Sequence, residues 1–330
     1  MNNTAEINHV FLKSIIERFG VAQIEDFYSS SIFYEYLDSL DNPIGNNIWG
    51  RVFRKEIING NFFYNNKFIN DVLLPQVFNI LNQNDFDLIS IPVGFLPIRR
   101  FNAISILGEK NEKAILMDIS LGWFLDRLFK MYLIYTYWDV IPRISDKYKK
   151  TDFETGLKYL VESITIYDKD KHVYIDEICN MTSVFDDSIY GFSIRTQIFI
   201  LLHEYSHFIL QHFDKSEIIK YNLNNEISQS GFSYNLNQEF EADENSFKHI
   251  LRNINDIDDL KGYTISLGVF FNILDLFETN NGKPTTHPPS FKRWEMLKYL
   301  INLLDNVIDS RFINRIEYPF QRLKTVPNTQ

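Results

Sequence analysis

The chain has 330 residues and a formal net charge of −10 at pH 7, with 43 acidic and 33 basic residues mixed along its length. No basic stripe appears, so we expect neither a nucleic-acid partner nor an anionic membrane surface. The single cysteine, Cys179, excludes an internal disulfide and a thiolate zinc cluster. A thiol enzyme built on Cys179 is a weak alternative, because one cysteine with histidine and aspartate elsewhere is common by chance.

The first residues, Met-Asn-Asn-Thr-Ala-Glu, lack a cationic segment followed by an apolar one, so no secretory signal is expected. Together with the cysteine usage, this favours a reducing cytoplasm. The hydrophobic fraction of 45% predicts a large core. The length allows either two domains or one elaborated domain. We place the boundary in the polar stretch 143–150, which gives an N-terminal accessory region at 1–145 and a second domain at 146–330.

The N-terminal region carries no motif that assigns it a role, but its pattern predicts helices and strands, and hence an α/β region. Two helices are expected at residues 6–19 and 33–40, and a third at 121–137. Apolar runs predict strands at 88–93, 103–107 and 114–118. After the boundary, residues 163–167 and 172–176 read as a hairpin, joined by a charged turn at 168–171. One of these hairpin strands could offer an edge to an extended substrate, although a plain structural hairpin fits equally well.

The most informative segment is residues 203–207, which read His-Glu-Tyr-Ser-His inside an apolar run at 198–210. Two histidines four residues apart on a helix point the same way. Their imidazoles can occupy two corners of a zinc tetrahedron, and Glu204 beside the first can act on the reacting water. The alternative is a chance pair of core histidines. Burying His203, Glu204 and His207 in so apolar a helix is costly unless a metal or hydrogen bonds satisfy them.

A third ligand is expected from the helix that a capping box at Asn235 and Gln238 predicts. On that helix Glu239, Ala242, Asp243 and Ser246 share one face. The small residues of that face would allow close approach to a neighbouring helix, so Glu239 is the expected ligand and Asp243 the group that orients an imidazole. Glu241 is the rival ligand but projects from another face. A solvated acidic helix start is the structural alternative.

A further helix is predicted after Thr286-His287-Pro288-Pro289, because proline suits a first helical turn and Thr286 can serve as the cap. This start would hold His287 rigidly, in a good position to stabilise an oxyanion. A loop histidine without function is an equal alternative.

These three segments together resemble the HtpX heat-shock protease and CAAX prenyl protease family of zinc metallopeptidases, which are gluzincins. Residues 239–243 match the family pattern E-F-x-A-D, and residues 286–293 match T-H-P-x-x-x-x-R. His207 is followed five residues later by His212, as is usual in that family. The similarity covers residues 193–304.

The resemblance implies an α+β, mainly helical protein with a zincin-like core, built from the HExxH helix, a third-ligand helix and a small edge sheet. It implies one Zn²⁺ ion and a protein or peptide substrate. Asp243, Arg293 and His212 would support the ligands, and Asp243 could pair with Arg293. The implied zinc ligands are His203, His207 and Glu239, with Glu204 as the catalytic base.

Most members of that family are embedded in membranes, whereas no run of about 18 apolar residues is found here. The short connection from His207 to Glu239 leaves no room for a membrane hairpin, and it resembles the soluble ImmA/IrrE regulatory metallopeptidases. We therefore expect a protein without membrane insertion.

The leading hypothesis is peptide hydrolysis, with His287 or a nearby tyrosine such as Tyr234 stabilising the oxyanion. The alternatives are a proteolytically silent, zinc-stapled interaction module, a zinc hydrolase of other substrates, and a stress or phage-defence protease restrained by its N-terminal region. The sequence does not predict the oligomeric state.

Overall fold

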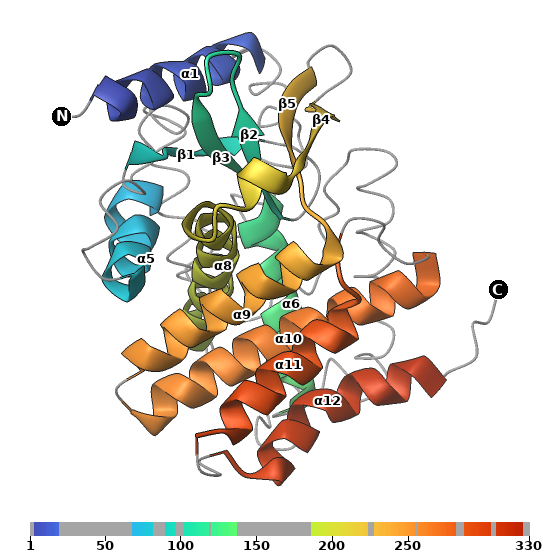
Figure 1. Cartoon of the computed structure of the whole chain (residues 1–330). Coiled ribbons are helices and arrows are strands. Elements are labelled where there is room, and N and C mark those ends of the chain that lie inside the picture. Colours follow the sequence, from blue (N-terminus) through green and yellow to red (C-terminus); the bar gives the residue numbers. More distant parts are fainter. Residues whose placement is uncertain are drawn as a thin grey trace, which may run out of the picture.

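In this computed structural model, one small sheet lies above a stack of helices (Figure 1). The structure describes residues 3–19, 68–81, 90–96, 102–118, 120–136, 186–223, 228–254, 256–281, 287–304 and 308–325. Helices predominate in these ranges, and the sheet is mixed. The architecture is therefore α+β and mainly helical, as expected.

The sheet has five strands in the order β1-β3-β2-β5-β4. β1 pairs in parallel with β3, and the other pairings are antiparallel. Ile106 of β2 pairs with Gly231 of β5, although the two residues lie more than 120 positions apart in the sequence. The sheet thus spans the predicted boundary near residue 145, which itself lies outside the described ranges, and the division into domains stays a prediction. The strands are β1 (Val93–Leu96), β2 (Ala103–Leu107), β3 (Lys113–Asp118), β4 (Glu217–Asn222) and β5 (Ser228–Ser233).

The predicted strands at 103–107 and 114–118 are confirmed by β2 and β3. The strand predicted at 88–93 is wrong in position, because β1 begins at Val93. Pro92 precedes it and has no N–H to donate to a ladder, although its carbonyl accepts from Ile115 N at 2.9 Å. The predicted helix at 33–40 and the hairpin at 163–176 lie outside the described residues.

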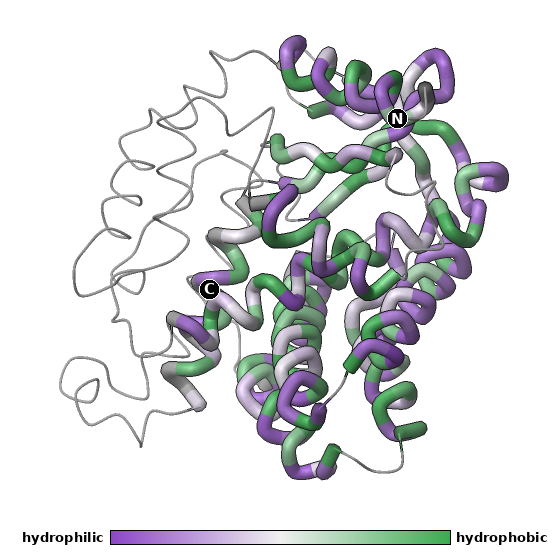
Figure 2. Tube along the Cα trace, turned by 90° about the vertical axis from the view of Figure 1, so that its left-hand side faces the viewer, coloured by the Kyte–Doolittle hydropathy of each residue, from purple (hydrophilic) through white to green (hydrophobic). Residues whose placement is uncertain are grey.

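The helices surround α8 (Asp186–Ile209), which contacts α5, α6, α9 and α10. This helix is buried on several sides, which explains the apolar run at residues 198–202 in its middle. By contrast, hydrophobic and hydrophilic residues alternate along α1 at the top of the molecule (Figure 2). The other helical elements are α1 (Asn3–Phe19), η1 (Phe68–Leu73), α5 (Leu74–Leu81), α6 (Ser120–Thr136), η6 (His212–Lys215), α9 (Leu236–Asn253), α10 (Ile257–Asn281), α11 (Ser290–Asn302) and α12 (Ser310–Thr325).

Within the part of the chain that the structure describes, one helix has the length and composition of a membrane span. Within α10, the segment Ile257–Glu278 has a mean hydropathy of 1.2, and 78% of its most apolar stretch is buried inside the fold. It packs against α8, α11 and α12. This burial is typical of a helix in the core of a fold.

The starts of two helices position the candidate site. The predicted capping box of α9 is confirmed: the Asn235 side chain accepts from Gln238 N at 3.1 Å, and the Gln238 side chain accepts from Asn235 N at 2.9 Å. Thr286, the predicted cap of α11, lies outside the described residues, and the N-cap of this helix is Pro289, which makes no side-chain cap. The acceptor comes instead from Glu278 of α10, whose Oε2 lies 3.0 Å from Ser290 N.

Gly231 provides a test of the junction between β2 and β5. A Cβ on Gly231 would lie 2.7 Å from the backbone oxygen of Ser105 and 2.6 Å from the Tyr221 ring. We expect Gly231→Ala to lower the free energy of unfolding by about 1–3 kcal/mol, measured by urea denaturation. Gly94→Ala is the control, because its Cβ meets only the rotatable end of Leu12. An equal or larger loss at Gly94 would contradict this account of the junction.

Candidate metal centre

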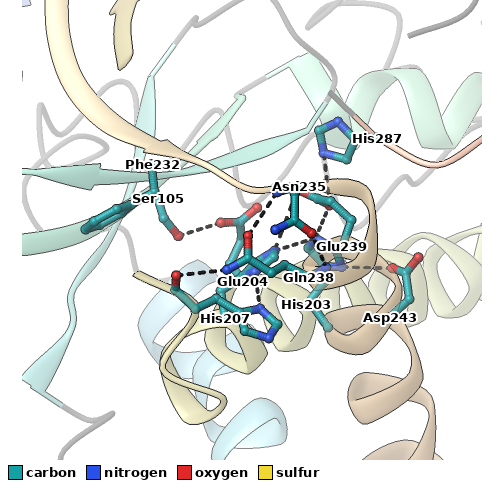
Figure 3. A network of polar contacts seen from close by, with 12 residues as sticks. Ser105, His203, Glu204, His207, Phe232, Asn235, Gln238, Glu239, Asp243 and His287 are labelled. Carbon is teal, nitrogen blue, oxygen red and sulfur yellow. Dashed lines mark hydrogen bonds and ion pairs between the residues drawn. The ribbon is translucent and has the colours of Figure 1, made fainter. Parts of the chain in front are cut away.

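Three buried side chains from α8 and α9 converge on one point (Figure 3). The Nε2 atoms of His203 and His207 lie 3.1 Å apart. Glu239 Oε2 lies 3.2 Å from His203 Nε2, and Glu239 Oε1 lies 3.9 Å from His207 Nε2. Each of the three residues is at most 3% exposed. The structure therefore brings together the residues that the sequence predicted as ligands.

These distances fit a divalent ion of the size of zinc. Ligand atoms about 2.0–2.2 Å from zinc lie roughly 3.3–3.6 Å from one another at tetrahedral angles. The three measured separations scatter around that range. In addition, Glu239 Oε2 is buried and makes no hydrogen bond of regular geometry within the described residues, although it lies 3.2 Å from His203 Nε2. An orphaned buried carboxylate oxygen is unfavourable, and a cation at this point would satisfy it.

Small side chains let α9 approach α8 closely enough for Glu239 to reach the histidines. Ala242 and Ser246 on α9 are both 0% exposed, and Ser206 faces them from α8. The hydroxyls of Ser206 and Ser246 lie 3.0 Å apart. This packing agrees with the prediction that the small residues on this face of α9 allow close approach to a neighbouring helix.

On the side away from the converging atoms, His203 contacts the carboxylate of Asp243, which is paired with the guanidinium of Arg293. Its Nδ1 lies 2.8 Å from Asp243 Oδ1, which fixes the ring so that Nε2 faces Glu239 and His207. Arg293 of α11 donates to both oxygens of Asp243, each at 2.6 Å. The predicted pairing of Asp243 with Arg293 is present in this geometry.

The electrostatics of this group favour a positive charge at the centre. Burial lowers the pKa of His203, but the carboxylates of Asp243 and Glu239 outweigh it and raise that pKa to about 10. Burial also raises the pKa of Asp243, but Arg293 and His203 hold it at about 2. Without metal, an imidazolium therefore balances the carboxylates. A bound cation would supply this positive charge in place of the proton on His203.

His207 has a different set of neighbours. Its Nδ1 lies 2.9 Å from His212 Nδ1, and His212 Nε2 lies 3.0 Å from Glu241 Oε2. The Tyr234 ring stacks on the His207 ring, with centroids 3.6 Å apart and planes 5° apart. His212 lies in η6 rather than on α8, because the chain turns at Gln211 with a φ of 56°. Glu241, the rival ligand, thus backs His212 and lies outside the group of converging atoms.

Glu204 has a partner that the sequence analysis missed. Ser105 Oγ of β2 donates to Glu204 Oε2 at 2.6 Å. Glu204 is 4% exposed, and burial raises its pKa above the ordinary value. Ser105 lies 99 residues before Glu204, in a strand without a motif. The one available signal was a serine at the centre of the apolar strand Ala-Ile-Ser-Ile-Leu.

Two further groups border the centre. His287 Nε2 lies 3.6 Å from Glu239 Oε2, and its side chain is 30% exposed. The Tyr234 hydroxyl is buried near Ser105 and Glu204, yet it makes no hydrogen bond of regular geometry within the described residues. His287 therefore lies on a more accessible side of the centre, and the Tyr234 hydroxyl lies on a buried side, close to Ser105.

These features define a buried His-His-Glu centre that can hold a metal ion and has a carboxylate, Glu204, beside it. Residues 151–310 match the model of the family described as Peptidase U49, which indicates a peptidase family. No curated protein and no solved structure matches the chain. The match includes every predicted site residue and supports a proteolytic function. It does not single out the HtpX and CAAX prenyl protease family.

The buried pair of Arg293 and Asp243 provides a test of the centre, with a more exposed arginine–aspartate pair as its control. Arg293→Ala leaves Asp243 uncompensated in the interior, so we expect it to cost about 3–5 kcal/mol of unfolding free energy. It should also weaken zinc affinity about 10–100-fold, because Asp243 would no longer hold His203 in place.

Arg195→Ala is the matched control. Arg195 pairs with Asp259 at 2.9 Å, but the two side chains are 28% and 35% exposed. Its loss should cost about 1 kcal/mol or less and leave zinc affinity unchanged. Urea denaturation and zinc titration measure both variants, and equal losses would contradict the structural role given to Arg293.

Proposed function

We propose that the protein is a zinc-dependent metalloendopeptidase of the gluzincin type that hydrolyses a cytoplasmic protein. The observation that carries the proposal is the convergence of His203, His207 and Glu239 beside the buried carboxylate of Glu204. The match of residues 151–310 to a peptidase family supports the reaction type.

The donor set suits zinc. Two neutral imidazole nitrogens and one carboxylate oxygen are typical of catalytic zinc sites with three protein ligands. Zinc held there would lower the pKa of a coordinated water to about 7 and polarise a substrate carbonyl. Asp243 accepts from Nδ1 of His203, which leaves the Nε2 lone pair for the metal.

Glu204 acts as the general base in this proposal. Its carboxylate takes a proton from the attacking water and passes it to the leaving amine. Burial raises the pKa of Glu204, which makes its carboxylate a stronger base than an exposed glutamate. Its place directly after His203 keeps it beside the metal ligands through the whole reaction.

The oxyanion that forms when the carbonyl is attacked needs hydrogen-bond donors. His287 is placed to donate from the partly exposed side of the centre, where a substrate can enter. The Tyr234 hydroxyl is a second donor, since it is buried beside Glu204 without a regular partner. A removed oxyanion donor typically costs about 10²–10³ in kcat.

The geometry argues against a silent zinc staple with His212 as its fourth ligand, and it leaves His287, whose Nε2 lies 3.6 Å from Glu239 Oε2, as the other candidate for that position. A staple would take a fourth protein ligand. His212 contacts the outer nitrogen of His207 instead of the converging Nε2 atoms. The hypothesis that residues 1–145 restrain the protease is hard to test by deletion, because the same region supplies β1, β2 and β3. Trimming it would remove the sheet above the site as well as any restraint.

The first test compares Glu204→Gln with the native protein. Glu204→Gln should keep one zinc per chain and lose nearly all cleavage of a proteome-derived peptide library, because only the base is removed. Elemental analysis and mass spectrometry of the cleaved peptides measure the two properties. His203→Ala is the control that should lose zinc. Cleavage by Glu204→Gln at the native rate would rule out the proposed base.

A second test separates the two oxyanion donors. Tyr234→Phe removes only a hydroxyl and keeps the ring stacked on His207. We expect Tyr234→Phe and His287→Ala each to lower kcat by about 10²–10³ with little change in KM. Steady-state kinetics on a cleaved library peptide measure this. A variant with native kcat identifies the group that does not contact the oxyanion.

A further inference from the structure

Ser105 lies in an environment where its hydroxyl needs a partner. It is 2% exposed and sits at the centre of β2, between Ile104 and Ile106, which are 7% and 0% exposed. A buried hydroxyl without a hydrogen bond is destabilising. Its partner is Glu204 Oε2 at 2.6 Å, so the base and the strand satisfy each other.

The strand that carries Ser105 is itself fixed on both sides. Ser105 pairs with Ile115 of β3 in the antiparallel ladder. On the other side, β5 approaches at Gly231, where an added Cβ would lie 2.7 Å from the Ser105 backbone oxygen. The position of the Ser105 hydroxyl is therefore set by the sheet and not by a mobile loop.

We propose, resting on the proposed function, that Ser105 is a positioning residue that holds the Glu204 carboxylate in the orientation needed for proton transfer. The bond fixes Oε2, which leaves Oε1 to face the reacting water. A carboxylate on a flexible glutamate side chain gains from such a bond, because a misplacement of about 1 Å can lower a rate about 10²-fold. The catalytic machinery thereby includes a residue of the N-terminal region, outside the segment 151–310 that matches the peptidase family.

The kinetic test uses the full-length zinc-loaded protein and a quenched fluorescent peptide taken from the cleaved library. Ser105→Ala should lower kcat about 10–100-fold while KM and zinc content stay at native values. Ser105→Thr keeps the hydroxyl and should restore most of kcat. Ser105→Cys, which is nearer in size but a weaker donor, should give an intermediate value and covers the case in which threonine does not fit.

Ser266→Ala is the matched control. Ser266 is 0% exposed and its hydroxyl donates to Gly262 O at 2.7 Å within α10, so its loss removes a comparable bond away from the site. It should leave kcat unchanged. A second readout needs no activity and uses the midpoint of urea denaturation. The shift of the double variant should be smaller than the sum of the shifts of Ser105→Ala and Glu204→Ala, since each single variant already removes the same hydrogen bond.

The outcomes separate this inference from the proposed function. If Glu204→Gln keeps native turnover, the proposed function fails whatever Ser105 does. If Glu204→Gln loses turnover while Ser105→Ala keeps native kcat, only the role of Ser105 is overturned. A parallel fall of kcat and zinc content in Ser105→Ala would also overturn it, because the serine would then support the fold of the centre and not the base.

Discussion

The close packing of α9 against α8 is the constraint on which the candidate site depends. Glutamate is short compared with the usual separation of about 8–10 Å between packed helices. Ala242 and Ser246 on α9 and Ser206 on α8 remove the bulk that would keep Glu239 away. Larger residues at these positions would separate the carboxylate from His203 and His207 even if every ligand were retained.

Charge balance is the second condition. Glu239, Asp243 and Glu204 lie close together in the interior, where like charges repel strongly. Arg293 compensates Asp243 through two hydrogen bonds, and the high pKa of His203 supplies a positive charge between Asp243 and Glu239. The same arrangement suits a divalent cation, which would replace the proton on His203. The charges of the centre are thus balanced without metal, and the two histidines and Glu239 could bind a cation in place of that proton.

The local parts of the site could be predicted from the sequence, because their determinants are local. The spacing of His203 and His207 on one helix and the capping box that begins α9 both follow from short-range geometry. The partners that come from distant elements could not be predicted in this way. Ser105 reaches Glu204 only because β2 lies against α8, and Glu278 is the acceptor at the start of α11 only because α10 packs against α11. His212, which the turn at Gln211 takes off α8, likewise contacts residues of a distant element, Gln238 and Glu241 of α9.

The most direct test of the central claim is the X-ray absorption spectrum of the zinc-loaded protein. The account predicts one zinc ion with four nitrogen or oxygen neighbours at about 2.0–2.1 Å and the scattering pattern of two imidazoles. A sulfur neighbour, which only Cys179 or a methionine could provide, would contradict it. So would a spectrum with one imidazole or with six oxygen neighbours, because the ion would then lie outside the centre formed by His203, His207 and Glu239.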